Sequence, residues 1–125
     1  MGDMKTASPS KVASEMQKML ADYHGKNTIL IEDIIEFHHR FESIHPFQDG
    51  NGRVGRIIMF KECLQHDIMP FIIDDEHKMF YYRGLKEYEF EKGYLTDTCL
   101  SAQDRYAVLV SYFFPEIFQK GSELA

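Results

Sequence analysis

The sequence predicts an all-α domain, and three observations support this fold class. Apolar residues recur at intervals of three and four along most of the chain, which is the spacing of one helix face. Proline and glycine stand between these periodic segments and mark their ends. Strand-like and helix-like segments do not alternate as they do in a parallel α/β sheet. With 125 residues, the chain has the length of one compact domain.

Two amphipathic helices are expected in the N-terminal half. Ser8-Pro9 is typical of a helix start, because proline suits the first turn, and Gly25-Lys26-Asn27 ends this helix. The second helix is expected over about residues 29–43, and Pro46 ends it near His45, since an interior proline loses a backbone hydrogen bond. The two apolar stripes are Val12, Met16, Met19, Leu20 and Tyr23, and then Ile31, Ile34, Ile35, His38 and Phe41.

Three more helices are expected in the C-terminal half. Helical periodicity resumes at Val54, and an apolar connector, residues 69–73, follows that helix. Asp74 or Asp75 can cap the next helix, which Lys92-Gly93 breaks. A last helix is expected from about residue 101 to 119, with Pro115 kinking or ending it. The apolar residues of these helices are Val54, Ile57, Ile58, Phe60 and Leu64, then Met79, Tyr82 and Leu85, and finally Tyr106, Leu109, Val110, Phe113 and Phe114.

Composition and charge limit the classes of ligand. Hydrophobic residues make up 44% of the chain, with ten Phe and seven Tyr, so the sequence can form a core rather than a disordered chain. The formal net charge is −6, which disfavours sequence-independent binding to nucleic acid. A polyanionic ligand would therefore need a local site, with a metal ion to help hold it.

The remaining features concern compartment and chain ends. Cys63 and Cys99 fit no zinc or redox spacing and indicate buried free thiols in a reducing compartment. No apolar run approaches the roughly 18 residues of a membrane span, and the first ten residues lack the apolar region of a secretory signal. We expect a cytoplasmic protein without a membrane partner. A disordered leader is expected at residues 1–8, the domain at 9–119 and a tail at 120–125.

The segment 45–56, HPFQDGNGRVGR, carries the candidate chemistry. GNGRVG matches the G-x-G-x-x-G of a dinucleotide-binding turn, and Asp74 and Asp75 follow about twenty residues later, where a ribose-binding acid would lie. That turn must follow a buried strand, however, and RFESIHPFQD contains a proline and no β-branched run. A P-loop fails because no G-K-[ST] follows. We therefore favour a phosphate site at a helix N-terminus, where the amides of Gly50, Asn51 and Gly52 meet the helix dipole.

Charged side chains surround this bend. Arg53 and Arg56 lie three apart in the first turn, which suits a di- or triphosphate, although a solvated helix face is the simpler alternative. Asp49 is either a turn residue or a ligand of Mg²⁺, which typically takes one or two carboxylates plus substrate phosphates. His45 is either structural or a general base, because imidazole titrates near neutral pH.

HPFQDGNGRVGR resembles, without a mismatch, the signature H-P-F-x-[D/E]-G-N-G-R-x-x-R of the Fic family. His38, Phe41 and Ile44 reproduce the H-x-x-F-x-x-I that commonly leads into it, and the similarity spans roughly residues 9–115. The resemblance implies an all-α bundle with the active-site loop between two central helices. It also implies an AMP transferase, which moves AMP from ATP to a Ser, Thr or Tyr hydroxyl of a target protein and releases pyrophosphate.

The resemblance further implies a role for each residue of the bend. His45 would deprotonate the attacking hydroxyl, and Asp49 would hold Mg²⁺ across the α- and β-phosphates. The residues that cradle and neutralise the phosphates would be Gly50, Asn51, Gly52, Arg53 and Arg56. Phe47 would anchor the loop in the core. Tyr81 or Tyr82 would flank the adenosine, although two tyrosines on an amphipathic helix also suit simple packing.

Two departures from the family pattern are expected to matter. The family usually has more chain before the first helix, including a β-hairpin flap that aligns the target, and its absence would expose apolar surface that favours a homo-oligomer. The inhibitory [S/T]-x-x-x-E-[G/N] motif of many members is also not found. Inhibition would then come from a missing N-terminal helix or from a separate partner.

Three alternatives remain open. A Doc-like protein kinase is disfavoured because Gly52 stands where that branch has lysine. A truncated nucleotide-binding fragment without transferase activity is the second alternative. A zinc site formed by His38, His39 and His45 is the third, although adjacent histidines on a helix point in different directions.

Overall fold

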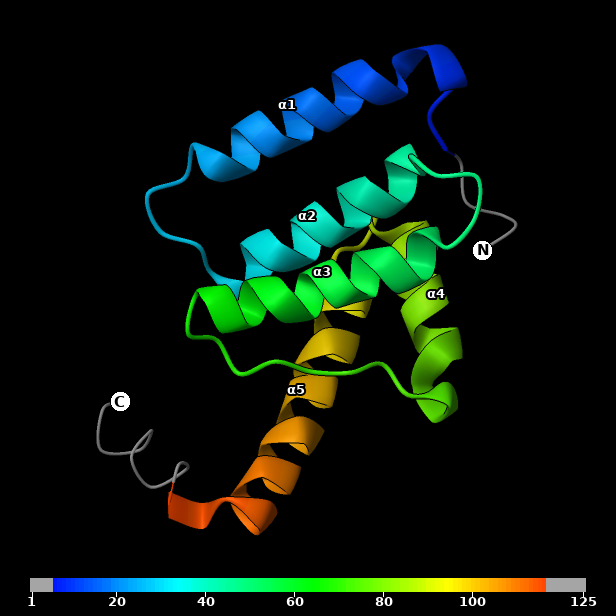
Figure 1. The fold of residues 1–125 in the computed structure, drawn as a ribbon. Coiled ribbons are helices and arrows are strands. Elements are labelled where there is room, and N and C mark those ends of the chain that lie inside the picture. Colours follow the sequence, from blue (N-terminus) through cyan, green and yellow to red (C-terminus); the bar gives the residue numbers. More distant parts are fainter. Residues whose placement is uncertain (1–5, 117–125) are drawn as a thin grey trace.

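The computed structural model describes residues 6–116, and these residues form helices without a strand (Figure 1). Five α-helices follow one another: α1 (Val12–His24), α2 (Ile31–Ile44), α3 (Asn51–Gln65), α4 (Lys78–Glu87) and α5 (Gly93–Phe113). Two short 3-10 turns, η1 (Pro9–Lys11) and η2 (Asp75–His77), lead into α1 and α4. The predicted all-α fold class is confirmed for this part of the chain.

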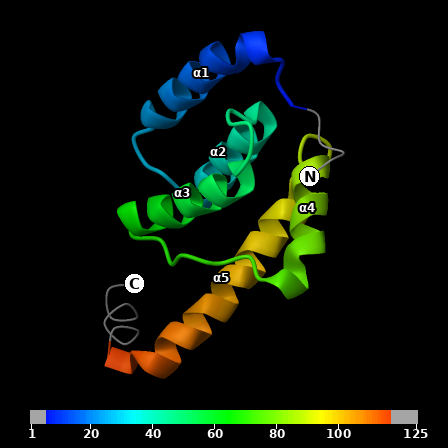
Figure 2. The ribbon, with the colours of Figure 1, turned by 45° about the vertical axis from the view of Figure 1, so that its right-hand side comes forward.

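Helices α1, α2 and α3 form one group, with α2 between the other two and packed against both (Figure 1). The bend at residues 45–50 connects α2 directly to α3, so the candidate site lies between two neighbouring helices. Helices α4 and α5 pack against each other as a hairpin, and α5 also contacts α2 (Figure 2).

Local hydrogen bonds explain where helices begin. The Leu30 N–H donates to the Asp33 carboxylate at 2.9 Å, which satisfies a backbone donor at the start of α2. Asp33 is also 3.4 Å from the Lys26 ammonium in the preceding turn. Before α4, the Asp74 carboxylate accepts from the His77 N–H at 3.0 Å. Of the two predicted caps, Asp74 rather than Asp75 therefore caps η2, the turn that leads into α4.

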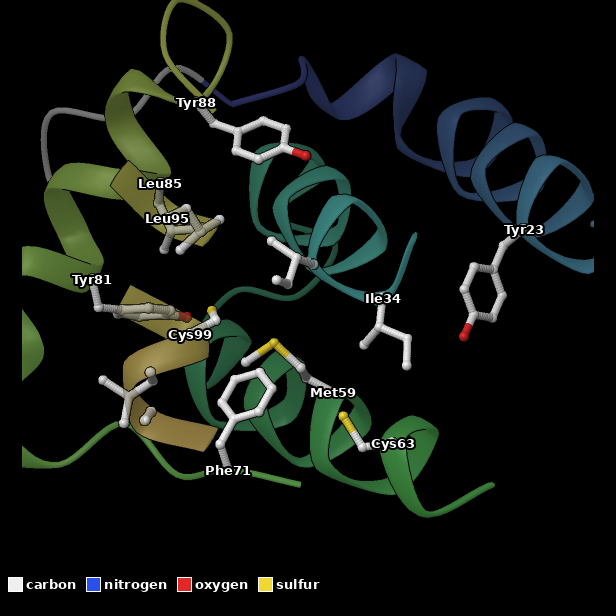
Figure 3. Close-up of a cluster of buried hydrophobic side chains, with 13 residues drawn as sticks. Tyr23, Ile34, Met59, Cys63, Phe71, Tyr81, Leu85, Tyr88, Leu95 and Cys99 are labelled. Atoms are coloured by element: carbon white, nitrogen blue, oxygen red, sulfur yellow. The ribbon is translucent and has the colours of Figure 1, made fainter. Parts of the chain in front are cut away.

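The main core lies where all five helices meet (Figure 3). The connector between α3 and α4 contributes Phe71 and Ile73, which are buried, whereas Ile72 between them is exposed. Helices α4 and α5 approach closely at Gly84, where a Cβ would lie 2.6 Å from Leu95 Cα. The buried members of this core are Tyr23, Ile34, Ile35, Met59, Cys63, Phe71, Ile73, Tyr81, Leu85, Tyr88, Leu95, Cys99 and Ala102.

The last helix differs from its prediction. Helix α5 begins at Gly93, eight residues before the predicted start, because Leu95, Cys99 and Ala102 form a buried face at helical spacing that the sequence analysis did not use. It ends at Phe113, before Pro115, and the predicted end at residue 119 lies outside the described residues. The second half of α5 extends past the other helices (Figures 1 and 2). Its predicted apolar stripe is consequently exposed at Leu109, Phe113 and Phe114.

The chain before α1 is partly held in place. The Ala7 N–H, within the expected leader, donates to the Ser43 carbonyl near the end of α2 at 3.0 Å. The other expectations for residues 1–5 and for the tail at 120–125 fall outside the described residues. Within the described range, no helix has the length and apolar composition needed to cross a bilayer.

Candidate functional site

His45 lies at the turning point between α2 and the bend. It is the C-cap of α2, and its N–H donates to the Phe41 carbonyl at 3.0 Å. Its backbone adopts φ 55° and ψ 60°, the left-handed region that residues other than glycine rarely occupy. Its Nδ1 is buried without a hydrogen-bond partner among the described residues. A strained histidine with an unused ring nitrogen is more typical of a functional site than of simple packing.

Asn51 fixes the shape of the bend. Its side-chain Oδ1 accepts from the Phe47 N–H at 2.9 Å, and its Nδ2 donates to the Phe47 carbonyl at 2.7 Å. Asn51 is only 3% exposed, so both bonds are protected from water. The carboxamide therefore joins the first turn of α3 to the loop, a role that the sequence analysis did not assign to it.

Phe47 does not anchor the loop in the core, contrary to the expectation from the family resemblance. Its side chain is 51% exposed, and its ring lies 6.3 Å from that of Phe41, centre to centre. The hydrogen bonds from Asn51 hold the backbone of Phe47 instead, which leaves its ring at the surface.

The N-terminus of α3 is open toward solvent. Gly50 is its N-cap, with φ 76°, and no side chain caps the helix. Nothing lies within 4 Å of the position that a Cβ on Gly50 would take. Helix α3 begins at Asn51, three residues before Val54, where helical periodicity was predicted to resume. Asn51 and Gly52 therefore lie in its first turn. Uncapped amides at an accessible helix N-terminus, reinforced by the dipole, attract anions.

Both arginines of the motif lie on α3 beside this open end. They also line a groove of about 390 Å³, whose other walls come from α3 and the connector before α4. Arg53 is exposed, whereas Arg56 is half-buried. The Arg56 guanidinium folds back over Gly52 and lies 5.7 Å from the centre of the Tyr81 ring. Of the two arginines, Arg56 therefore has the more defined position.

The structure separates the two tyrosines of the predicted adenosine site. Tyr81 is fully buried, so in this structure its ring is not available to stack on a nucleotide, and this expectation needs correction. Figure 3 shows its ring among the core side chains, near Cys99. Tyr82 is exposed, and of the pair only Tyr82 can reach a ligand at the surface.

The Tyr81 hydroxyl takes part in a buried hydrogen bond. It lies 2.5 Å from His38 Nε2. Burial lowers the pKa of His38 to about 3, so His38 is neutral at physiological pH. Burial also raises the pKa of Tyr81, which keeps its hydroxyl protonated. We assign Tyr81 as the donor and His38 Nε2 as the acceptor on this basis.

Glu42 is a site neighbour that the sequence analysis missed. It lies on α2 with no exposed surface, and its carboxyl meets α3 at Gly55, where any Cβ would collide with it. A charged residue on an amphipathic helix is usually solvated, so its residue type alone does not predict burial. The available signal was its spacing: it follows His38 by four residues, on the same helix face.

The side-chain chemistry of Asp49 suits the expected role of a magnesium ligand. Its carboxylate is exposed in the bend, immediately before the open N-terminus of α3. A hard oxygen ligand beside a phosphate site is what Mg²⁺ requires, because most of its other ligands are phosphate and water oxygens. Residues 6–116 contain no group of three His, Cys, Asp or Glu that could hold a metal ion without substrate. The histidines of the zinc alternative, His38, His39 and His45, form no such group.

Comparison with known proteins agrees with the motif. Residues 1–63 match the model of the Fic/DOC family. A probable protein adenylyltransferase of Aquifex aeolicus is 38% identical over 64 residues, which cover 51% of this chain and 19% of that protein. Protein adenylyltransferase Fic of Aedes aegypti is 40% identical over 49 residues, covering 39% of this chain and 10% of that protein.

A longer match has lower identity. Protein adenylyltransferase fic-1 of Caenorhabditis elegans is 26% identical over 87 residues, which cover 67% of this chain and 17% of that protein. The chain thus spans less than a fifth of the length of these curated relatives.

Proposed function

The chain belongs to the Fic/DOC family, whose model matches residues 1–63, and on this premise we propose that it is a protein adenylyltransferase. It would transfer AMP from ATP to a Ser, Thr or Tyr hydroxyl of a target protein and release pyrophosphate. The relatives from Aquifex aeolicus and Aedes aegypti bear that name. ATP and a hydroxyl-bearing target protein are the partners that this reaction requires.

One observation supports the nucleotide site most strongly. The N-terminus of α3 has no side-chain cap and open space at Gly50, and the guanidinium of Arg56, one helical turn later, lies over Gly52. Backbone donors and a guanidinium that converge on one accessible place favour a polyphosphate. In this proposal Gly50, Gly52 and Asn51 contribute backbone amides, while Arg53 and Arg56 contribute charge.

The transfer step involves one proton and one leaving group. The target hydroxyl oxygen forms a bond to the α-phosphorus of ATP, and the bond from that phosphorus to the oxygen bridging to the β-phosphate breaks. Pyrophosphate leaves with the electron pair, and His45 accepts the hydroxyl proton. Such a positioned base contributes about 10²–10⁴-fold to a rate. Phosphoryl transfer depends otherwise on positioning and charge neutralisation, which the bend and its arginines would supply.

Asp49 would hold the magnesium ion that accompanies ATP. The ion would supply further neutralisation of phosphate charge when bound. Within the chain, Asn51 would keep Asp49, His45 and the amides of α3 in fixed relative positions, because it ties the loop to the helix.

Label transfer from ATP tests this function. A cell lysate would be incubated with the protein and with either α-labelled or γ-labelled ATP, and labelled proteins would be separated by electrophoresis. We expect α-label alone on a target in the presence of the wild type. His45→Ala should abolish the label, while His24→Ala, a change on the exposed end of α1, should not. Transfer of γ-label alone would instead indicate a kinase, and no label would indicate a nucleotide-binding protein without transferase activity.

A further inference from the structure

A cluster of polar side chains is buried between α2, α3 and α4, next to the proposed phosphate site. We call it the buried polar cluster: His38, Glu42 and Tyr81 are buried, and the half-buried Arg56 is its fourth member. Three helices contribute to it, so it forms only when α2, α3 and α4 have packed together. The transfer step described above uses Arg56 alone among these residues.

One hydrogen bond and one ring contact link His38 to Arg56 through Tyr81. The Tyr81 hydroxyl donates to His38 Nε2 at 2.5 Å. The Arg56 side chain in turn interacts with the Tyr81 hydroxyl and lies 5.7 Å from the centre of its ring. The Arg56 guanidinium therefore lies near both the Tyr81 ring and Gly52, at the open end of α3.

Glu42 is the unexplained member of the cluster. Neither of its carboxyl oxygens has a hydrogen-bond partner among the described residues, and its Oε1 is 4.0 Å from His38 Nε2. His38 is neutral, so the two do not form an ion pair. Gly55 leaves space for the carboxyl, which a larger residue at that position would fill. The Glu42 carboxyl therefore occupies the space that Gly55, which has no side chain, leaves at the α2–α3 contact.

Packing does not account for a carboxyl in this position. Burial of an unpaired acid opposes folding, and a neutral side chain of similar shape would be tolerated at least as well. Buried acids with raised pKa values are concentrated at functional sites, where their protonation depends on a nearby charge. Here burial raises the pKa of Glu42 to about 7, even though the Arg56 charge acts in the opposite direction.

The charges that face Glu42 can be named helix by helix. His38 is its neighbour on α2, Arg56 acts on it from α3, and Tyr81 faces it from α4. On α5, the Cys99 thiol acts electrostatically on Tyr81 and not on Glu42. Burial raises the pKa of Tyr81 and of Cys99 and lowers that of His38, so these three groups stay neutral near pH 7. Within residues 6–116, Arg56 is then the one charged group that acts on Glu42.

We propose that Glu42 is a positioning residue whose charge acts on the Arg56 guanidinium across the buried polar cluster, in competition with the phosphates of the bound nucleotide, so that nucleotide binding is linked to proton uptake at Glu42. This inference rests on the proposed nucleotide site. Phosphates on the outer side of Arg56 reduce the positive charge that Glu42 experiences, and a buried carboxylate without its counter-charge takes up a proton. Ionised Glu42 in turn weakens the attraction of Arg56 for phosphate.

The linkage has a defined direction with pH. Nucleotide binds most tightly where Glu42 is already protonated, and affinity falls as rising pH ionises it. For each unit by which bound phosphate raises the pKa of Glu42, affinity falls by up to about tenfold across the titration range. Glu42→Gln keeps the shape of the side chain without its charge, so its affinity should not show this fall.

Calorimetry with magnesium-bound ATP tests the inference. Binding would be measured near pH 7 in two buffers that differ in ionisation enthalpy, which gives the number of protons taken up. We expect fractional proton uptake by the wild type and by Glu32→Gln, a matched change at an exposed position on the same helix. Glu42→Gln should show no such uptake, and its affinity at about pH 8 should equal or exceed that of the wild type.

The outcomes separate this inference from the proposed function. Equal proton uptake by the wild type and Glu42→Gln, with binding intact, would overturn only the role of Glu42. Absence of uptake in the wild type would do the same, and this measurement does not depend on the folding of a variant. If magnesium-bound ATP binds neither the wild type nor Glu32→Gln, the nucleotide site itself fails and the inference fails with it.

Discussion

The Arg56 guanidinium occupies the space beside Gly52: a Cβ on Gly52 would lie 3.0 Å from Arg56 Nη1. The second glycine of the motif is therefore matched to its second arginine, one helical turn later. Because the guanidinium also lies against Tyr81, it is held between the first turn of α3 and the side chain of a residue on α4.

Gly52→Ala should weaken nucleotide binding without lowering the stability of the fold. The new methyl group displaces the flexible end of Arg56 rather than backbone, so the fold is retained, and alanine is favoured over glycine in a helix by up to about 1 kcal/mol. Loss of one guanidinium–phosphate contact should weaken ATP binding by about tenfold. Calorimetric titration and urea unfolding measure the two effects, with Gly93→Ala in the first turn of α5 as the control. A variant with both normal affinity and normal stability would contradict this placement of Arg56.

Asn51→Asp replaces a side chain by one of nearly equal size, yet it should destabilise the bend. The carboxylate can still accept from the Phe47 N–H, but it cannot donate to the Phe47 carbonyl and repels it instead. A buried hydrogen bond lost in this way costs about 1–3 kcal/mol. We expect lower unfolding free energy and faster amide hydrogen exchange in residues 45–50. Asn27→Asp, an exposed change before α2, should leave both unchanged.

The unfolding free energy should depend on pH through Glu42. Burial raises its pKa in the folded state from 4.5 to about 7. Between these values the folded protein holds a proton that the unfolded chain has released, so stability falls as pH rises through this range. The loss amounts to about 3 kcal/mol at most. Glu42→Gln should therefore become more stable relative to the wild type from about pH 4.5 to pH 7. A constant difference between the two proteins over that range would show that Glu42 is not buried as an acid.

Gly84→Ala should destabilise the fold without changing the site chemistry directly. The new Cβ would meet backbone, since it would lie 2.6 Å from Leu95 Cα and 2.8 Å from Leu95 N. Helices α4 and α5 must then separate, at a cost of about 1–3 kcal/mol or more. Chemical denaturation measures this cost. A stability equal to that of the wild type would contradict the close crossing of the two helices.

Sequence periodicity predicted where the helices lie better than it predicted which of their apolar faces are buried. It placed α1, α2 and the core of α3 closely, because one-sided apolar stripes at Ile34, Ile35 and Phe41 do become buried. It failed for the second half of α5, where Leu109, Phe113 and Phe114 have the same spacing but are exposed. A stripe indicates which face of a helix is apolar, and it does not show whether another element covers that face.

The candidate site was predicted where its residues are contiguous and missed where helices meet. The motif at residues 45–56 lies in one bend, so its spacing alone brings His45, Gly50 and Arg56 into one region. Glu42 and Tyr81 come to Arg56 through the packing of α2 and α4 around α3, which local pattern does not encode. The burial of Tyr81 had one usable signal, since Tyr81, Leu85 and Tyr88 follow one another at helical spacing and all three are buried.

The most direct test of the account is a magnetic resonance titration of the isotopically labelled protein with magnesium-bound ATP. It reports on each backbone amide of the bend and the first turn of α3. We predict saturable shifts concentrated in residues 45–56, with Gly50 and Gly52 among the largest, and weaker binding for Arg56→Ala. Shifts confined to other parts of the molecule, or no saturable shift at all, would contradict the claim that this bend holds the triphosphate.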